Sequence, residues 1–344
     1  MKKILLIILS LVITNFVIAC GHPEIDYLEN EFSIIIDTDS FNIERADSAK
    51  KSSVDTTSII IPDSSKHTDT KLTIHFSTRI IGRGIIKSNS LIYNNTRLSG
   101  QGMAIYGNYM FRLHHSGYCC VYDLNDINNI QLVGSFPLAS YSSDNHANCA
   151  QFAREVQPDT GFPLLYVSNN SNGRKCTVEK ITTWGSELIQ SISFKSNDFL
   201  RTPNTIIGDD GFLWTLGSVG NISSGNYGAA FYKFNAPSLD VKDVIIEPSD
   251  TLDHFQDVGV PQTWQGGIIK KGKAFFLFGT SSVNRQIRVY DTKSHKSLCI
   301  INLNKVTTAE PEDIDIWQDN KIIMTLNGVN YAILIEFEDN PYIP

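Results

Sequence analysis

Polar side chains of similar kinds recur at roughly regular intervals along the chain, each just before a short apolar segment. We name them the entry residues: Gln101, His146, Asn148, Asn204, Trp264, Gln265 and Glu312. Amide, imidazole and carboxyl groups donate and accept hydrogen bonds, and the indole of Trp264 offers a flat face for stacking. If the fold gathers these residues, they form a binding site for a polar ligand such as a glycan. The alternative interpretation is that they are polar because they line a water-filled channel.

Two entry residues, His146 and Glu312, are the candidates for acid and base in catalysis. A glycosidase of the usual kind needs two carboxyl groups that face each other across the substrate. Acidic residues are present at one entry only, where Glu310, Glu312 and Asp313 are close in sequence. The chain also lacks the HExxH, GxSxG and P-loop patterns. These observations favour a binding protein over an enzyme.

The sequence predicts no metal site and no cofactor. His146 and Glu312 would supply two ligands from distant parts of the chain, whereas a metal site usually has three or more protein ligands. His114 and His115 are adjacent, so on a strand they would point to opposite sides. A hydrogen-bonded histidine near a channel is therefore the favoured interpretation of His146.

Six cysteines are present, and Cys20 ends the apolar N-terminal segment. The others are Cys119, Cys120, Cys149, Cys176 and Cys299. Their number is odd, so at least one thiol is free even in an oxidising compartment. None of them stands in a CxxC pair. We expect buried cysteines that pack like small apolar residues, with a single disulfide among Cys120, Cys149 and Cys176 as the alternative.

The elements that position the entry residues are short strands. From residue 72 onward, runs rich in Ile, Val, Tyr and Phe alternate with turns of Gly, Asn, Asp and Ser, and no long segment has helical periodicity. A turn followed by an apolar strand recurs at Gly107–Leu113, Phe162–Val167, Asp210–Leu216, Gly272–Phe278 and Asn320–Leu326. A second apolar strand follows each of these, at Tyr118–Leu124, Cys176–Ile181, Ala230–Phe234, Gln286–Asp291 and Ala332–Phe337. An entry strand precedes each pair, so the body is all-β and built from five similar modules.

A fourth strand follows the pair in each of the first four modules, with Val241–Ile246 as the fourth strand of module three. Four antiparallel strands make one propeller blade. The fifth module has three strands, and Leu72–Phe76 is expected to supply the missing one, because this removes an exposed edge. The sequence thus predicts a five-bladed β-propeller over residues 72–344, closed by an N-terminal strand. The alternatives are a six-bladed propeller that includes residues 72–98 and a two-sheet sandwich.

The N-terminal segment has the features of a secretory leader, since two lysines precede an uncharged apolar run over residues 4–18. This run is shorter than the about 20 residues that a membrane-spanning helix needs. Val17-Ile18-Ala19-Cys20 resembles the lipobox of bacterial lipoproteins. The resemblance implies that residues 1–19 are a cleaved signal peptide and that Cys20 carries lipid such as palmitate. Gly21 stands where an aspartate would retain such proteins in the inner membrane, so the resemblance implies the outer membrane.

Residues 20–71 are rich in Ser, Thr and Asp and poor in apolar side chains. This composition predicts that the residues after the lipidated cysteine form a flexible tether. Without residues 1–19 the chain has 27 basic and 36 acidic residues, a formal charge of −9. No basic surface is then expected to collect phosphates, which argues against nucleic acid as a partner. The expected partners are the membrane, through the lipid anchor, and a glycan or protein ligand.

The lipobox, the polar tether and a degenerate propeller with Glu-Pro-Glu-Asp-Ile-Asp at residues 310–315 together resemble the β-propeller lipoproteins of Bacteroidota. The chain lacks the Trp-Asp repeat ends of WD40 proteins and the recurring double-glycine pattern of kelch repeats. The resemblance implies an envelope protein in the outer membrane, facing the periplasm or the cell surface. We expect non-catalytic binding of a glycan, peptide or partner protein at one propeller face. The alternative is an envelope hydrolase or lyase with its active site at the channel mouth.

Overall fold

The computed structural model describes residues 57–59, 74–85, 92–93, 96–97 and 99–338, with gaps at 128–129, 170–174, 184, 196–200, 222–225, 259, 261–262, 283, 319–320 and 330. The predicted signal peptide, Cys20 and most of the predicted tether lie outside the described residues. The described part is β-structure joined by turns, with a short 3₁₀ helix η3 (Pro248–Asp250). No helix in it is long and apolar enough to cross a membrane.

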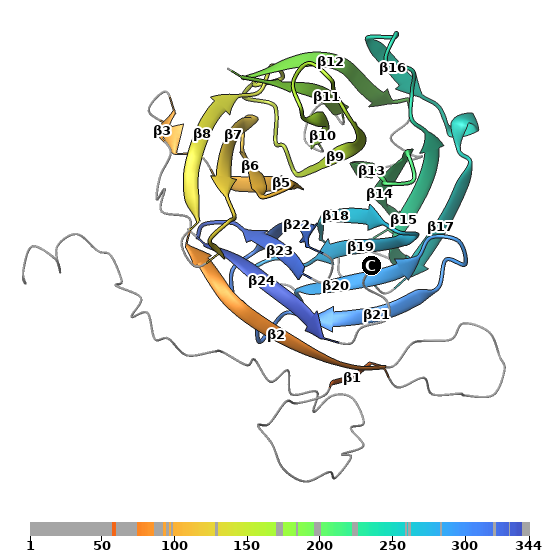
Figure 1. Ribbon diagram of the computed structural model, residues 1–344. Coiled ribbons are helices and arrows are strands. Elements are labelled where there is room, and N and C mark those ends of the chain that lie inside the picture. The colour runs from red at the N-terminus through yellow and green to blue at the C-terminus, as the bar shows by residue number, and fades with distance from the viewer. Residues whose placement is uncertain are drawn as a thin grey trace, which may run out of the picture. The chain divides into compact units, whose positions relative to one another are not determined.

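Five sheets form the blades of a propeller (Figure 1). Blade one contains β5 (Gly100–Tyr106), β6 (Tyr109–His114), β7 (Tyr118–Asp123) and β8 (Gln131–Pro137). Blade two contains β9 (Cys149–Val156), β10 (Pro163–Asn169), β11 (Lys175–Thr182), β12 (Gly185–Phe194) and β16 (Asp243–Ile246). Blade three contains β13 (Arg201–Ile207), β14 (Phe212–Asn221), β15 (Asn226–Asn235) and β17 (Asp253–Val258).

Blade four contains β18 (Trp264–Lys270), β19 (Lys273–Phe278), β20 (Gln286–Asp291) and β21 (Ser297–Asn302). Blade five contains β22 (Pro311–Trp317), β23 (Lys321–Leu326), β24 (Tyr331–Glu338), β2 (Ile74–Ile85) and β1 (Thr57–Ile59). A separate hairpin is formed by β3 (Ile92–Tyr93) and β4 (Thr96–Arg97). The prediction of an all-β, five-bladed propeller is confirmed.

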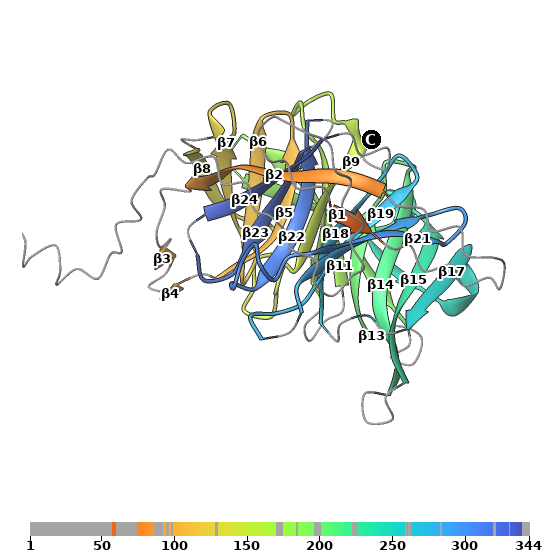
Figure 2. The same ribbon diagram turned by 90° about the horizontal axis from the view of Figure 1, so that it is seen from below.

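An N-terminal strand completes blade five, as the sequence predicts. Strand β2 pairs antiparallel with β24, from Ser77 opposite Glu338 to Ile85 opposite Tyr331, and Figures 1 and 2 show the two strands side by side. The pairing segment is therefore later than the predicted Leu72–Phe76, whose last residues pair with β1 instead. Because β2 belongs to blade five, the six-bladed alternative and the two-sheet sandwich are wrong.

The predicted outer strand of blade three lies in a different blade. Strand β16 pairs in parallel with β12, with Ser191 opposite Asp243, and so extends blade two. The outer position in blade three is taken by β17, which pairs antiparallel with β15. Gln190 holds the exchanged segment, because its Nε2 donates to the carbonyl oxygens of Ser238 and Val241 at 2.7 Å each. The apolar pattern of residues 241–246 indicates a strand but does not identify its neighbour.

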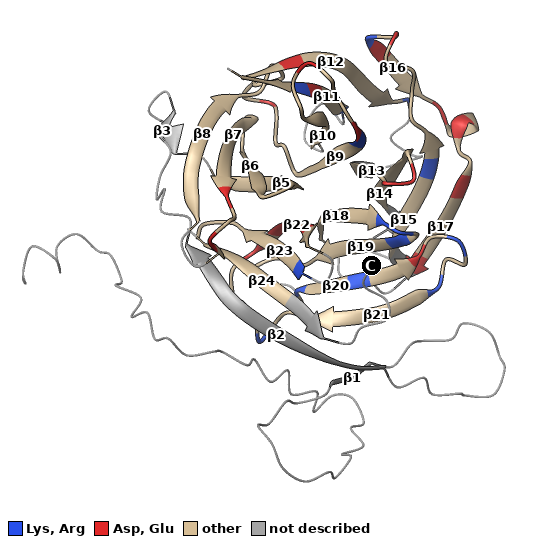
Figure 3. Ribbon diagram, in the orientation of Figure 1, with Lys and Arg blue, Asp and Glu red and all other residues tan. Residues whose placement is uncertain are grey.

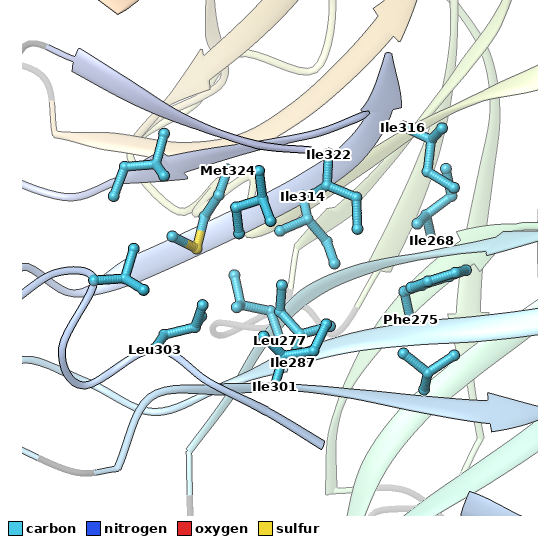
Figure 4. Close-up of a cluster of buried hydrophobic side chains, with 14 of the residues drawn as sticks. Ile268, Phe275, Leu277, Ile287, Ile301, Leu303, Ile314, Ile316, Ile322 and Met324 are labelled. Carbon is cyan, nitrogen blue, oxygen red and sulfur yellow. The ribbon is translucent and has the colours of Figure 1, made fainter. Parts of the chain in front are cut away.

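Among the described residues the core consists of five clusters of buried apolar side chains; four of them join two neighbouring blades, and the cluster between blades three and four also includes Cys149 of blade two. Strand β19 shows how alternation produces this arrangement. Phe275 and Leu277 pack toward blade five, whereas Phe276 and Phe278 pack toward blade three. Figure 4 shows the first of these interfaces, where residues of β18 to β21 meet residues of β22 and β23. Burial of each large side chain stabilises the fold by about 1.5–3 kcal/mol.

The five cysteines of the described part are all free and buried. The expectation of buried cysteines is confirmed, and the alternative of a disulfide among Cys120, Cys149 and Cys176 is wrong. Cys119 and Cys120 belong to different core clusters, because adjacent residues of β7 point to opposite faces. Burial raises the pKa of the Cys120 thiol to about 12, so these thiols are protonated at neutral pH.

Candidate functional site

The innermost strand of each blade is its first strand, and neighbouring inner strands run in the same direction. Asp313 of β22 binds the N–H of Met103 on β5, and Asp315 binds the N–H of Ile105, two residues further along both strands. Asn204 of β13 likewise donates to the carbonyl of Gln265 on β18. We call the end at which these strands begin the mouth of the ring. The entry residues all lie at this end, as the sequence predicts.

Four of the five inner strands have a register shift at the mouth. In β5, β13, β18 and β22 the pairing with the second strand shifts by one residue after Gly100, Arg201, Trp264 and Pro311 respectively. Gln101, Gln265 and Glu312 lie within three of these irregularities. A β-bulge turns side chains away from regular alternation and is common beside binding sites. Blade two has no such register shift at the mouth. Instead, Ala147 just before β9 adopts a left-handed conformation with φ of 47°.

The entry residues form two layers. Gln101, Asn148, Asn204, Gln265 and Glu312 are buried, with exposed fractions between 1% and 7%. His146 and Trp264 are half-buried. His146 and Trp264 are therefore the entry residues that a ligand could touch first.

Two buried amides connect neighbouring strands. Asn204 Nδ2 donates to the carbonyl oxygen of Gln265 at 2.7 Å. Gln265 Nε2 donates to the carbonyl oxygen of Gly279 at 3.1 Å and to Glu310 Oε1 at 3.2 Å. These contacts give the amides a structural role in the ring, whether or not a ligand also reaches them.

Asp313 connects the inner strands of several blades. Its Oδ2 accepts hydrogen bonds from the N–H groups of Met103 on β5 and Ala150 on β9. Gly266 on β18 lies so close that a Cβ there would overlap the Asp313 carboxyl group. Figure 3 shows acidic residues on β22 beside β5, which has none. At this level the inner strands are joined by a carboxyl group.

Glu312 is a neutral carboxylic acid at neutral pH. Burial raises its pKa to about 9, and the charges of Glu310 and Asp313 act in the same direction, while Arg112 and a hydrogen bond with Asn327 oppose them. A protonated carboxyl group donates one hydrogen bond and still accepts others. Glu312 can therefore donate as well as accept a hydrogen bond at neutral pH.

His146 lies in different surroundings from Glu312. Its ring packs edge to face on the ring of His115, with 5.2 Å between centroids, and its backbone N–H donates to Asn169 Oδ1 at 3.1 Å. Burial lowers the pKa of His146, and the charge of His115 lowers it further. Neither His146 nor His115 is among the residues whose charges shift the pKa of Glu312. Within the described part, the geometry does not pair His146 with Glu312 as acid and base.

Among the described residues, no group of three or more His, Cys, Asp or Glu side chains is arranged to hold a metal ion. His114 is buried at the end of β6, whereas His115 is half-buried and faces His146. The two adjacent histidines thus have different surroundings.

Arg112 is a mouth residue that the sequence analysis did not identify. It lies on β6 and is buried, and its Nη2 donates to the carbonyl oxygens of Leu326 at 2.8 Å and Val329 at 3.4 Å. Its sequence signal is an arginine at an alternate position of a strand that is otherwise apolar. Such a residue is buried with its charge, and it needs polar partners from another blade.

No protein-family model matches the chain, and no curated protein matches it. Among solved structures, the chain is similar to the calcium structure of a Trichoderma reesei carbohydrate-active enzyme of family AA12. The identity is 8%, the TM-score is 0.38, and the match covers 83% of this chain and 99% of that one. It is also similar to MPT-4, a mannose phosphorylase from Leishmania mexicana, with 10% identity, a TM-score of 0.42 and coverage of 77% and 90%. At these values the likeness carries no argument about function.

Proposed function

We propose that this chain is an envelope-anchored lipoprotein whose propeller binds a glycan at its mouth without transforming it. The observation that supports this most directly is the repeated register shift at the mouth, which places Gln101, Gln265 and Glu312 at the starts of three inner strands. Together with the half-buried Trp264 and His146, these groups offer stacking and hydrogen bonds to hydroxyl groups. A ligand rich in hydroxyl groups fits this chemistry better than an apolar one.

The absence of an acid and base pair in the described part favours binding over catalysis. The carboxyl groups of Asp313 and Asp315 accept hydrogen bonds from backbone N–H groups of neighbouring strands. Glu312 keeps its proton at neutral pH, and His146 faces His115. A hydrolase would need a proton donor and a second carboxyl or base across the substrate.

Binding is tested on the full chain, purified in detergent micelles, first on a glycan array and then by titration calorimetry with the glycans that bind. Trp264→Ala is expected to weaken binding by about tenfold, because stacking on the indole is lost, and His146→Ala is expected to weaken it as well. The matched control is Tyr109→Ala, an exposed aromatic residue beyond the far end of β5. Binding that none of the mouth variants changes would contradict the proposed site, and cleavage of a bound glycan would contradict non-catalytic binding.

The anchor is proposed at Cys20, in the outer membrane. Metabolic labelling with an alkyne analogue of palmitate, in a Gram-negative host, should label the wild-type chain and leave Cys20→Ala unlabelled. Fractionation should then find the wild-type chain in outer-membrane vesicles and the variant outside them. Equal labelling of both chains would contradict lipidation at Cys20.

A further inference from the structure

Two histidines from neighbouring blades meet at the mouth. His115 directly follows β6 of blade one, and His146 precedes β9 of blade two. Their ring centroids are 5.2 Å apart, with 71° between the ring planes. Both side chains are half-buried, so an ion in solution can reach them. We call His115 and His146 the histidine pair.

The separation of the two rings suits a shared metal ion. A metal bound through a ring nitrogen lies about 2.0–2.1 Å from that nitrogen, and therefore about 3.2 Å from the centre of the imidazole ring. At the tetrahedral angle that zinc prefers, two imidazoles on one ion then have centres about 5.2 Å apart. The rings of the histidine pair have this separation.

The ring nitrogens are available as ligands. Nδ1 of His115 is shielded from solvent and has no hydrogen-bond partner within the described residues, whereas buried polar atoms normally have one. His146 is held by its backbone N–H, which donates to Asn169 Oδ1, and not by its ring. None of the ion pairs formed by the described residues includes either histidine. Each ring can therefore offer a nitrogen lone pair, which zinc, copper and nickel ions bind well.

The backbone holds the two histidines in place from both sides. The N–H of Ser116 donates to the carbonyl oxygen of Asn145 at 2.6 Å, so the residues next to the two histidines are joined. Ser116 and Ala147, which directly follow the histidines, have left-handed φ values of 75° and 47°. Residues other than glycine rarely adopt this conformation, and those that do are common at functional sites. The distance between the rings is thus set before any ion binds, as a metal site requires.

We propose that the histidine pair binds a divalent transition-metal ion such as Zn²⁺, with one ring nitrogen of each histidine as a ligand and water in the remaining positions. The sequence analysis considered His146 with Glu312, and His114 with His115, whereas the fold brings His115 to His146. Imidazole ligands favour zinc, copper and nickel over magnesium and calcium, which prefer oxygen. The inference goes beyond the proposed function, because the ion needs neither a glycan nor Trp264.

The test is a calorimetric titration of the full chain with zinc chloride, in detergent micelles and after removal of metals with a chelator. One ion should bind per chain. His115→Gln and His146→Gln should each weaken binding by about tenfold or more, since loss of even an outer-shell partner of a metal site costs about 10–100-fold. His254→Gln is the matched control, because His254 is an exposed histidine that stacks on Tyr232, and it should bind zinc like the wild-type chain. Zinc binding that neither pair variant weakens would mean an adventitious ion only and would overturn the inference.

Chemical footprinting of the wild-type chain decides the question if a variant fails to fold. Diethyl pyrocarbonate modifies accessible imidazole rings, and mass spectrometry of the peptides locates the modified residues. Zinc should protect His115 and His146 and leave His254 reactive, whereas equal modification of the pair with and without zinc would overturn the inference. Glycan binding that depends on Trp264, without zinc binding, would leave the proposed function standing, and zinc binding without glycan binding would have the opposite meaning.

Discussion

The side-chain oxygen Oδ2 of Asp313 lies 2.8 Å from the backbone nitrogen of Met103, although the two residues are 210 positions apart in the chain. Two residues further along the same strands, Asp315 Oδ2 accepts from the N–H of Ile105 at 2.6 Å. Met103 and Ile105 belong to the first blade and the two acids to the last. The inner edge of the ring is therefore closed by carboxyl groups, and the outer edge is closed by β2.

Asp313→Ala should destabilise the chain by about 3 kcal/mol or more, because it leaves buried N–H groups of Met103 and Ala150 without an acceptor. Asp243→Ala changes an exposed aspartate on β16 and should shift the free energy of unfolding by less than about 0.5 kcal/mol. Urea denaturation of both variants measures the difference. Similar stabilities would show that Asp313 does not hold the ring.

Gly266→Ala should also destabilise the protein, by about 1–3 kcal/mol, because the added methyl group would overlap the Asp313 carboxyl group. Gly134→Ala is the control, since nothing lies within 4 Å of a Cβ at that position. This control should leave stability unchanged or raise it slightly. A thermal unfolding curve for Gly266→Ala that overlays the wild-type curve would contradict the close approach.

Stability should fall as pH rises from about 4.5 to about 9, and Glu312 contributes to this fall together with Asp313 and Asp315, whose pKa values burial also raises. Burial raises the pKa of Glu312 from 4.5 to about 9. The charges of Glu310 and Asp313 act in the same direction, and the charge of Arg112 acts against them. Between these values the unfolded chain binds fewer protons than the folded chain, so the unfolded state is favoured as pH rises. Glu312→Gln should match the wild-type free energy of unfolding near pH 4.5 and exceed it by about 1 kcal/mol or more near pH 8. Parallel pH profiles of the two chains would contradict this assignment.

Removal of residues 1–56 should leave the ring intact, because the described blades begin with β1 and β2. Removal of residues 1–85 should expose the edge of β24, lower the melting temperature and promote self-association. Size-exclusion chromatography and thermal unfolding distinguish the two truncations. A monomeric chain of wild-type stability after the longer deletion would show that β2 is dispensable.

The site could be predicted only in part. The repetition of entry strands was enough to place Gln101, Asn204, Gln265 and Glu312 at one end of the ring, because equivalent positions of equivalent blades meet around the axis. It did not predict that these side chains are buried, that Asn204 donates to the Gln265 carbonyl, or that Arg112 joins them. Arg112 lies inside an apolar strand, and its partners Leu326 and Val329 belong to the last blade.

The sequence alone favoured five four-stranded blades over the six-bladed alternative, because alternation of apolar residues and turn-forming residues is a local property that each segment carries. It also indicated an N-terminal strand for blade five, since a three-stranded last module leaves an edge without a partner. Which strands pair across modules is visible in the fold alone. Residues 241–246 join blade two instead of blade three, and Ser77–Ile85 pairs with β24. Such pairing depends on long-range packing and hydrogen bonds, as with Gln190 and Asp313, that no local pattern records.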